Sequence, residues 1–160
     1  MEVHGGGLVD INQGGAGGGT ADLPAEYSEH SPDVITNDTA TNFSALAGST
    51  PSLPAGNYEI AVSYMWSKGS GPQSDFIANL LIDGTNVTAW GGDMHRASPA
   101  DSTGGNVAGT LTNQSYPVTM TFQRTFAVSG AHSFDLLFRS EFDGDRSSIR
   151  DALISFRELP

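Results

Sequence analysis

The sequence predicts an all-β protein, a jelly-roll β-sandwich of about eight strands preceded by an extended glycine-rich N-terminal arm. Apolar and polar residues alternate with a period of two through most of the chain after residue 40, which is typical of strands with one buried face. Gly, Pro, Asp and Ser separate these segments, and no convincing helix is found. Many short strands without helices indicate two packed sheets.

We expect one folded domain with an N-terminal extension. The chain has 160 residues and a hydrophobic content of 38%, which suits a single domain with a real core. Residues 1–33 are predicted to be an extended arm that continues, from residue 20, as a polar linker. Residues 34–160 are predicted to form the sandwich.

Glycine dominates the arm, with eight of the first twenty residues. Glycine loses more backbone freedom on ordering than any other residue, so such a segment does not stabilise a domain from within. Pro24 and Pro32 disfavour a long helix in the linker. Leu8, Val9 and Ile11 lie between two glycine-rich flanks, and we expect them to anchor the arm to a partner in an assembly.

The first strands are assigned from short apolar segments at Val34–Ile35 and Thr41–Leu46. The stretch NYEIAVSYMW then places every second residue on one apolar face, in the pattern of a half-buried strand. That face comprises Tyr58, Ile60, Val62, Tyr64 and Trp66. We expect Trp66 to lie at the end of a core face.

Later strands are predicted at FIANLLID, which ends in an Asp83–Gly84 turn, and at a short segment Val87–Trp90. The alternating segments VTMTFQRTFAV and HSFDLLF are predicted to be two more strands. The closing segment SSIRDALISFREL is compatible with a helix or a strand, and its alternation favours a strand.

A long polar run, Gly91–Pro117, exceeds the length of a hairpin connection. We expect it to be an exposed functional loop or a segment that rests on a partner. Trp90 lies beside this run, so it is the better candidate for an exposed contact with a glycan.

Charge excludes several classes of partner. The formal net charge is −11, and the first basic residue is Lys68. A nucleic-acid backbone or an anionic membrane surface would repel such a chain, so we expect no nucleic-acid partner and no membrane insertion. The absence of cysteine excludes disulfides and thiolate metal sites. The first residues show no basic segment followed by an apolar stretch, and we expect a protein made in the cytoplasm.

No catalytic residues, cofactor or metal ligands are predicted. The sequence HGGG at its start is similar to an oxyanion-hole segment, but the matching G-x-S-x-G element is missing, so we expect no enzyme. The histidines His4, His30, His95 and His132 are too dispersed to indicate a metal site. Glu141, Asp143 and Asp145 offer oxygens to a calcium ion, although their spacing favours an Asp-Gly hairpin turn; the sequence leaves this ion open.

Charged residues on apolar faces favour an assembly. In the last strand we expect Arg150 on the face of Ala152, and Asp151 on the opposite face. Arg124 falls on the apolar face of an earlier strand. We expect Arg124, Arg150 and Asp151 to be subunit contacts that pair with acidic residues such as Asp135. The alternative is a strand end at which the guanidinium reaches water.

The stretch TPSLPAGNYEIAVSYMW, a strand ending in IDG, FAVSGAHSFDLLFR and the terminal IRDALISFREL together resemble small jelly-roll structural proteins of tailed bacteriophages. The resemblance covers Thr41–Leu159 and extends to head-decoration, cement and tail-fibre modules. It implies a non-enzymatic accessory subunit that docks through its arm on the major capsid protein or on tail proteins. It further implies a homo-oligomer of three copies, located in the virion and assembled in the bacterial cytoplasm.

The pattern L-x-A-G-x-Y-x-I, present as LPAGNYEI, also resembles non-catalytic jelly-roll carbohydrate-binding modules. That resemblance implies a tail-fibre, adhesin or carbohydrate-binding module that recognises a surface glycan through Trp90 and the loop Gly91–Pro117. The terminal SSIRDALISFREL departs from the endings of those modules.

Overall fold

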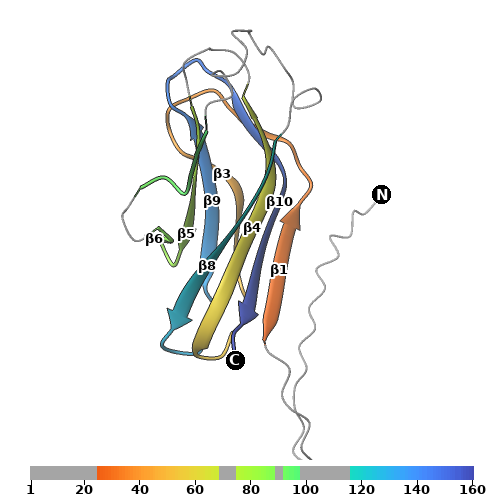
Figure 1. Cartoon of the computed structure of the whole chain (residues 1–160), viewed down its shortest axis with the longest axis vertical. Helices are drawn as coiled ribbons and strands as arrows, with labels where there is room; N and C mark the ends of the chain where they lie inside the picture. Colours follow the sequence, from red (N-terminus) through yellow and green to blue (C-terminus); the bar gives the residue numbers. More distant parts are fainter. Residues whose placement is uncertain (1–24, 69–74, 89–91, 98–115) are drawn as a thin grey trace, which may run out of the picture.

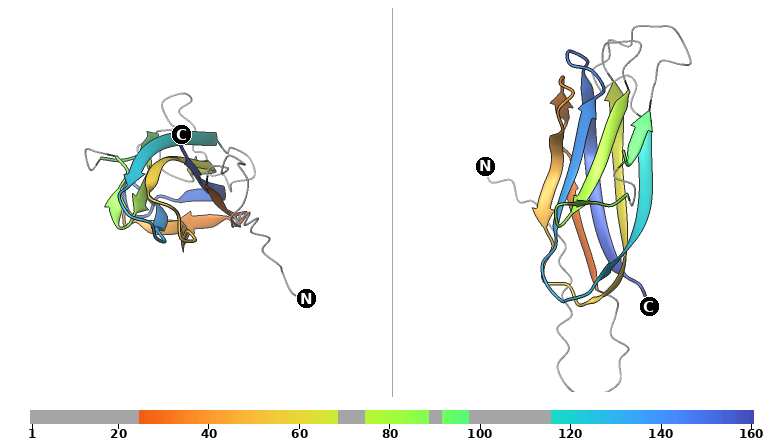
Figure 2. Two further views of the ribbon diagram at one scale, coloured as in Figure 1. Left: turned by 90° about the horizontal axis from the view of Figure 1, so that it is seen from below. Right: turned by 90° about the vertical axis from the view of Figure 1, so that its left-hand side faces the viewer.

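The computed structural model describes residues 25–68, 75–88, 92–97 and 116–160, which form a two-layer β-sandwich elongated along its strands (Figure 1). The two layers are seen end-on and from the side in Figure 2. The predicted all-β sandwich is confirmed, and the described residues contain ten strands rather than about eight. No helix within these residues is long and apolar enough to cross a membrane.

Sheet A has the strand order β1-β10-β4-β8, and β2 also pairs with β10. Its strands are β1 (Glu26–Ser31), β2 (Ile35–Asn37), β4 (Gly56–Lys68), β8 (Tyr116–Phe126) and β10 (Ser147–Glu158). Sheet B has the order β3-β9-β5-β6, and β7 also pairs with β5. Its strands are β3 (Phe43–Ser49), β5 (Phe76–Ile82), β6 (Thr85–Asn86), β7 (His95–Ala97) and β9 (Ser133–Ser140).

Strand pairing is nested along the chain, which defines the jelly roll. β1 pairs with β10, β3 with β9, β4 with β8 and β5 with β7, all antiparallel. Successive pairs alternate between sheet A and sheet B. The chain is therefore one long hairpin wound into two sheets.

The core fills the space between the inward faces of the sheets. The predicted apolar face of β4 is confirmed, since each of its five residues is at most 5% exposed: Tyr58, Ile60, Val62, Tyr64 and Trp66. Trp66 stacks on Phe76 of the opposite sheet with ring centroids 4.9 Å apart, as expected for a core residue. The predicted inward residues of β5 and β9 are also buried.

A β-bulge in β10 corrects the faces predicted for the last strand. Asp151 and Ala152 both lie opposite Tyr64, because the register passes from Arg150↔Met65 to Leu153↔Ser63. Asp151 has a left-handed φ of 51°, which is uncommon for a residue with a Cβ.

The bulge reverses the alternation of side chains along β10. Ile149 before the bulge and Ala152 after it are both buried. Arg150 instead lies opposite Met65 on the outer face, whereas the sequence predicted it on the face of Ala152. That prediction is wrong because strict alternation does not allow for an extra residue.

Three short segments also differ from the sequence expectation. β1 lies within the predicted linker, and that interpretation is wrong for residues 26–31: Tyr27 packs 6.1 Å from the ring of Phe156. β7 lies within the predicted loop Gly91–Pro117. In the predicted strand Val87–Trp90, the described residues Val87 and Thr88 are outside any strand.

The two Asp-Gly turns are present. Asp83 and Gly84 have positive φ values of 51° and 71°, which suit the tight turn between β5 and β6. Gly144, with φ 86°, lies in the turn after β9. This second turn joins sheet B to sheet A, so it is not the hairpin that the sequence predicted.

Gly48 is a sensitive position of the fold. A Cβ at Gly48 would lie 2.7 Å from Cζ of Phe134, which is buried between Tyr27 and Phe156. We expect Gly48→Ala to lower the free energy of unfolding by about 1–3 kcal/mol through overpacking. Urea denaturation measures this change. Gly130→Ala is the control, because nothing lies within 4 Å of its added Cβ; equal stability of the two variants would contradict the packing.

Candidate functional site

Strand β8 forms one edge of sheet A and is the basis of the candidate site. It pairs with β4 on one side, and among the described residues no strand pairs with its other side. The strand has 11 residues, contains no Asp or Glu, and carries one charge, on Arg124. Proteins normally protect long edge strands with charges, bulges or a covering segment. This edge is therefore suited to pairing with another chain.

The inward side chains of β8 leave apolar surface along this edge. Val118, Met120 and Phe122 pack against the core but stay only partly buried. Tyr116, at the start of the strand, is 41% exposed. Partial exposure follows from the position of β8 at the end of its sheet, where none of the described strands covers the far side.

On the outer face of sheet A, β8 is polar but almost uncharged. Thr119 and Thr121 lie opposite Ser63 and Ala61 of β4. The carboxylate of Glu59 accepts a hydrogen bond from Arg157 at 2.7 Å, so this pair contributes no net charge. The whole chain has a net charge of −11. Because this face of β8 carries almost no charge, it repels an acidic partner only weakly.

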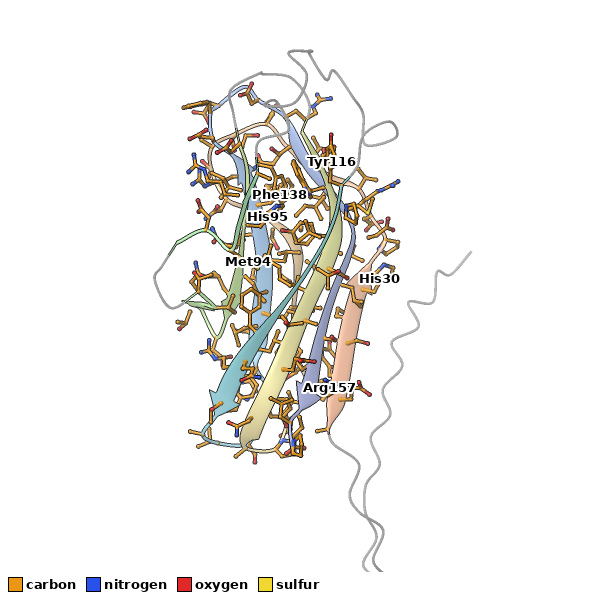
Figure 3. The ribbon with its side chains drawn as sticks, viewed as in Figure 1. His30, Met94, His95, Tyr116, Phe138 and Arg157 are labelled. Carbon is orange, nitrogen blue, oxygen red and sulfur yellow. The ribbon has the colours of Figure 1, made fainter. Side chains whose placement is uncertain are left out.

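Aromatic side chains cluster where β8 begins, between the two sheets. Trp66 lies 5.0 Å from Tyr116 and 5.4 Å from His95, measured between ring centroids. The Tyr64 hydroxyl and Nδ1 of His95 share a hydrogen bond of 2.9 Å. Figure 3 labels Tyr116, His95 and Phe138 in this part of the molecule. The cluster backs the exposed ring of Tyr116 with a rigid support.

Burial shifts the pKa values of Tyr64 and His95 in this cluster. It raises the pKa of Tyr64 above its ordinary value of 10.0. It lowers the pKa of His95 below 6.5, because the charged imidazolium loses hydration between the rings. Both groups are therefore neutral at pH 7, which suits their shared hydrogen bond.

An ion-pair network fixes β7 against its neighbours in sheet B. Arg96 of β7 donates to Asp75 at 2.5 Å and also to Glu141. Arg139 of β9 lies 3.9 Å from Asp93. The bonds to Asp75 and Glu141 raise the pKa of Arg96. The network holds the short β7 in place, and with it His95.

His132 lies at the opposite end of the sandwich, where it contacts Asp83, Phe126 and Thr50. Its Nδ1 lies 2.8 Å from the Asp83 carboxylate, and its ring stacks on Phe126. Its backbone exchanges hydrogen bonds with Thr50. Nε2 of His132 is buried and, within the described part of the chain, has no hydrogen-bond partner. These contacts indicate a structural role.

The predicted assembly residues do not form one cluster. Leu8, Val9, Ile11 and Trp90 lie outside the described residues. Arg124 faces inward opposite Tyr58, on the apolar face where the sequence placed it. Asp135 accepts a hydrogen bond from Ser44 in sheet B, so the structure does not pair it with Arg124.

The bulge instead brings Arg150 and Asp151 together, with Nε of Arg150 and Oδ2 of Asp151 3.5 Å apart. Nε of Arg150 is buried and has no hydrogen-bond partner among the residues described. The predicted subunit contacts at these residues stay predictions.

The candidate calcium ligands have other partners. Glu141 pairs with Arg96, and Asp143 accepts a hydrogen bond from the backbone of Ala40. No group of three or more potential metal ligands occurs in the described segments. His30 lies exposed on β1, and Figure 3 shows it apart from His95.

Sequence reasoning missed the aromatic cluster and the edge position of β8. The signal for the edge was available: the segment YPVTMTFQRTF has a proline near its start and no acidic residue in an acidic chain. Tyr116 was assigned to a loop, so its place at the start of a strand was not expected.

Comparison with known proteins yields distant structural likeness. No protein-family model matches the chain, and no curated protein matches it. The latent dimeric PorU of Porphyromonas gingivalis is 12% identical with a TM-score of 0.49, over 92% of this chain and 14% of that one. The VP2 protein of infectious bursal disease virus in T=1 particles is 10% identical with a TM-score of 0.49, over 94% and 36%.

TmCBM61 in complex with β-1,4-galactotriose is 17% identical with a TM-score of 0.34, over 82% of this chain and 88% of that one. The chain spans well under half the length of PorU and of VP2. These matches are distant, and the assignment of a jelly-roll β-sandwich rests on the nested strand pairing of this chain itself.

The lowered pKa of His95 predicts a pH-dependent stability. The folded protein favours neutral His95, so this contribution is present above the unfolded pKa near 6.5 and is lost as the pH falls below it. Unfolding free energy measured between pH 7 and 5 should fall less in His95→Gln than in the unaltered protein. His30→Gln is the control, since His30 is exposed. An equal pH dependence in both variants would refute the assignment.

Proposed function

We propose that this chain is a non-enzymatic bacteriophage virion structural protein, an accessory capsid decoration or cement subunit anchored by its N-terminal arm. The observation that supports an assembly role is the edge of β8, which is long, free of acidic residues and bordered by partly buried apolar side chains. An isolated acidic monomer gains nothing from such an edge, whereas an assembly covers it. The virion setting comes from the sequence resemblance over Thr41–Leu159.

In this proposal the sandwich is a rigid body and the arm provides attachment. The major capsid protein or tail proteins are the partners, and three copies form the expected homo-oligomer. Assembly takes place in the bacterial cytoplasm and the final location is the virion. Nucleic acid and membrane insertion play no part, because the net charge of −11 opposes both.

Deletion of residues 1–20 tests the anchor. All described strands begin after residue 25, so the shortened protein should keep its circular dichroism spectrum and its unfolding midpoint. It should no longer copurify on a density gradient with virions of the phage that encodes the chain. Full-length protein carrying Val128→Ser is the control, because Val128 is 70% exposed on a connection. Unchanged copurification of the shortened protein would refute the anchor.

One observation favours a second function, recognition of a surface glycan. The exposed ring of Tyr116 is backed by Trp66, which is how aromatic platforms for sugar rings are built. The sequence names Trp90, which lies outside the described residues, as a further candidate glycan contact.

Under this second function, Tyr116→Ala and Trp90→Ala should each reduce glycan or cell binding at least tenfold while virion attachment persists. A glycan array and a cell-binding assay measure the effect. Phe43→Ala is the control, because Phe43 is also exposed but lies on β3. Binding unaltered by either substitution would eliminate the glycan function.

A further inference from the structure

We propose that the edge of β8 that faces away from β4 binds the N-terminal arm of a second copy, which adds the segment Leu8–Ile11 to sheet A as an extra strand. This inference rests on the proposed function in one respect, that the arm is an anchor, and it names the surface that receives the arm.

Backbone groups make the edge of β8 the receptor. An edge strand presents a row of N–H and C=O groups that an extended segment can pair with, and main-chain hydrogen bonds then supply the affinity. After Pro117, which has no N–H, β8 continues to Phe126 without another proline, so every second residue can direct its N–H and C=O groups toward the edge that faces away from β4. The strand is thus long enough for a four-residue segment in more than one register.

Charge complementarity favours the edge of β8 as the receptor for the arm. Residues 1–24 contain three acidic residues, Glu2, Asp10 and Asp22, and no Lys or Arg. β8 contains Arg124 and no acidic residue. β1, at the other end of sheet A, carries Glu26 and Glu29 and no Lys or Arg, so it would repel an acidic arm.

The remaining long edge, β3, is a poorer receptor. Its pairing with β9 is interrupted by a register shift between Ser44 and Leu46. Such a bulge twists the strand and blunts an edge for further pairing. β3 also has no basic residue, and Asp135 lies beside it opposite Ala47.

Side-chain alternation in the arm suits the partly buried row of β8. In an extended strand Val9 and Ile11 lie on one face. Turned inward, they would cover the partly buried Met120 and Phe122. Asp10 would then lie over the outer face, beside the uncharged Thr119 and Thr121.

A second copy is a better donor than the chain's own arm. The arm joins the sandwich at β1. In sheet A, β10 and β4 lie between β1 and β8, so a chain's own arm would have to cross both strands to reach β8. Two copies placed with the acidic β1 end of one beside the β8 end of the next bring opposite charges together. This arrangement also places the point where the donor's arm joins β1 next to the receptor edge. This head-to-tail contact closes into a ring when the rotation permits.

The experiment combines sedimentation with hydrogen exchange on the purified full-length protein. Association should rise with concentration, and the β8 amides should become protected in the same concentration range. Thr121→Glu places a negative charge on the exposed outer face at the centre of β8 and should weaken association at least tenfold. Ser49→Glu, on the exposed end of β3 in sheet B, adds the same charge away from both edges of sheet A and should leave association unchanged.

The arm is tested separately with full-length protein carrying Leu8→Ser, Val9→Ser and Ile11→Ser. This variant should lose both association and β8 protection while the sandwich stays folded. Protection of β8 that does not depend on concentration would mean that the chain's own arm binds, and would overturn the inference. Association with protected β8 in the serine variant would mean that copies pair edge to edge, and would also overturn it.

The outcome is independent of the virion experiment. Self-association is measured on purified protein, so failure of the full-length protein to copurify with virions would refute the proposed function alone. Loss of copurification on deletion of the arm, without any change in association, would support the anchor and refute the β8 receptor.

Discussion

The pairing of β4 with β10 is the interaction on which the rest of the structure depends. These are the two central strands of sheet A, and their inward residues form the floor of the core. β1 and β2 attach to β10, and β8 attaches to β4. The residues of β4 and β10 are far apart in the sequence, so forming this pair closes a long stretch of chain and costs loop-closure entropy.

The bulge at Asp151 changes which side chains of β10 face the core. Before the bulge, Ile149 packs inward opposite Trp66; after it, Ile154 packs inward opposite Val62. Both ends of β10 therefore bury apolar side chains, and the charged Arg150 and Asp151 stay near the surface. One left-handed residue thus keeps a long strand amphipathic where strict alternation would have buried an arginine.

Much of this architecture could be predicted from the sequence, because a single buried face leaves a clear period of two. The face of β4 from Tyr58 to Trp66 is an example. The bulge could not be predicted, since one inserted residue leaves the composition of a strand unchanged. β1 was missed because its apolar content is a single residue, Tyr27, and its stability comes from pairing with β10. The aromatic cluster depends on contacts of Trp66 with His95 and Tyr116, and these three residues lie in three different strands.

The central claim is that this acidic sandwich works as a subunit of an assembly, through an edge that carries no acidic residue. Native mass spectrometry of the full-length protein at several concentrations tests it most directly. The account predicts a defined multiple of the chain mass, with three copies expected. A strict monomer at every concentration, with or without residues 1–20, would contradict it.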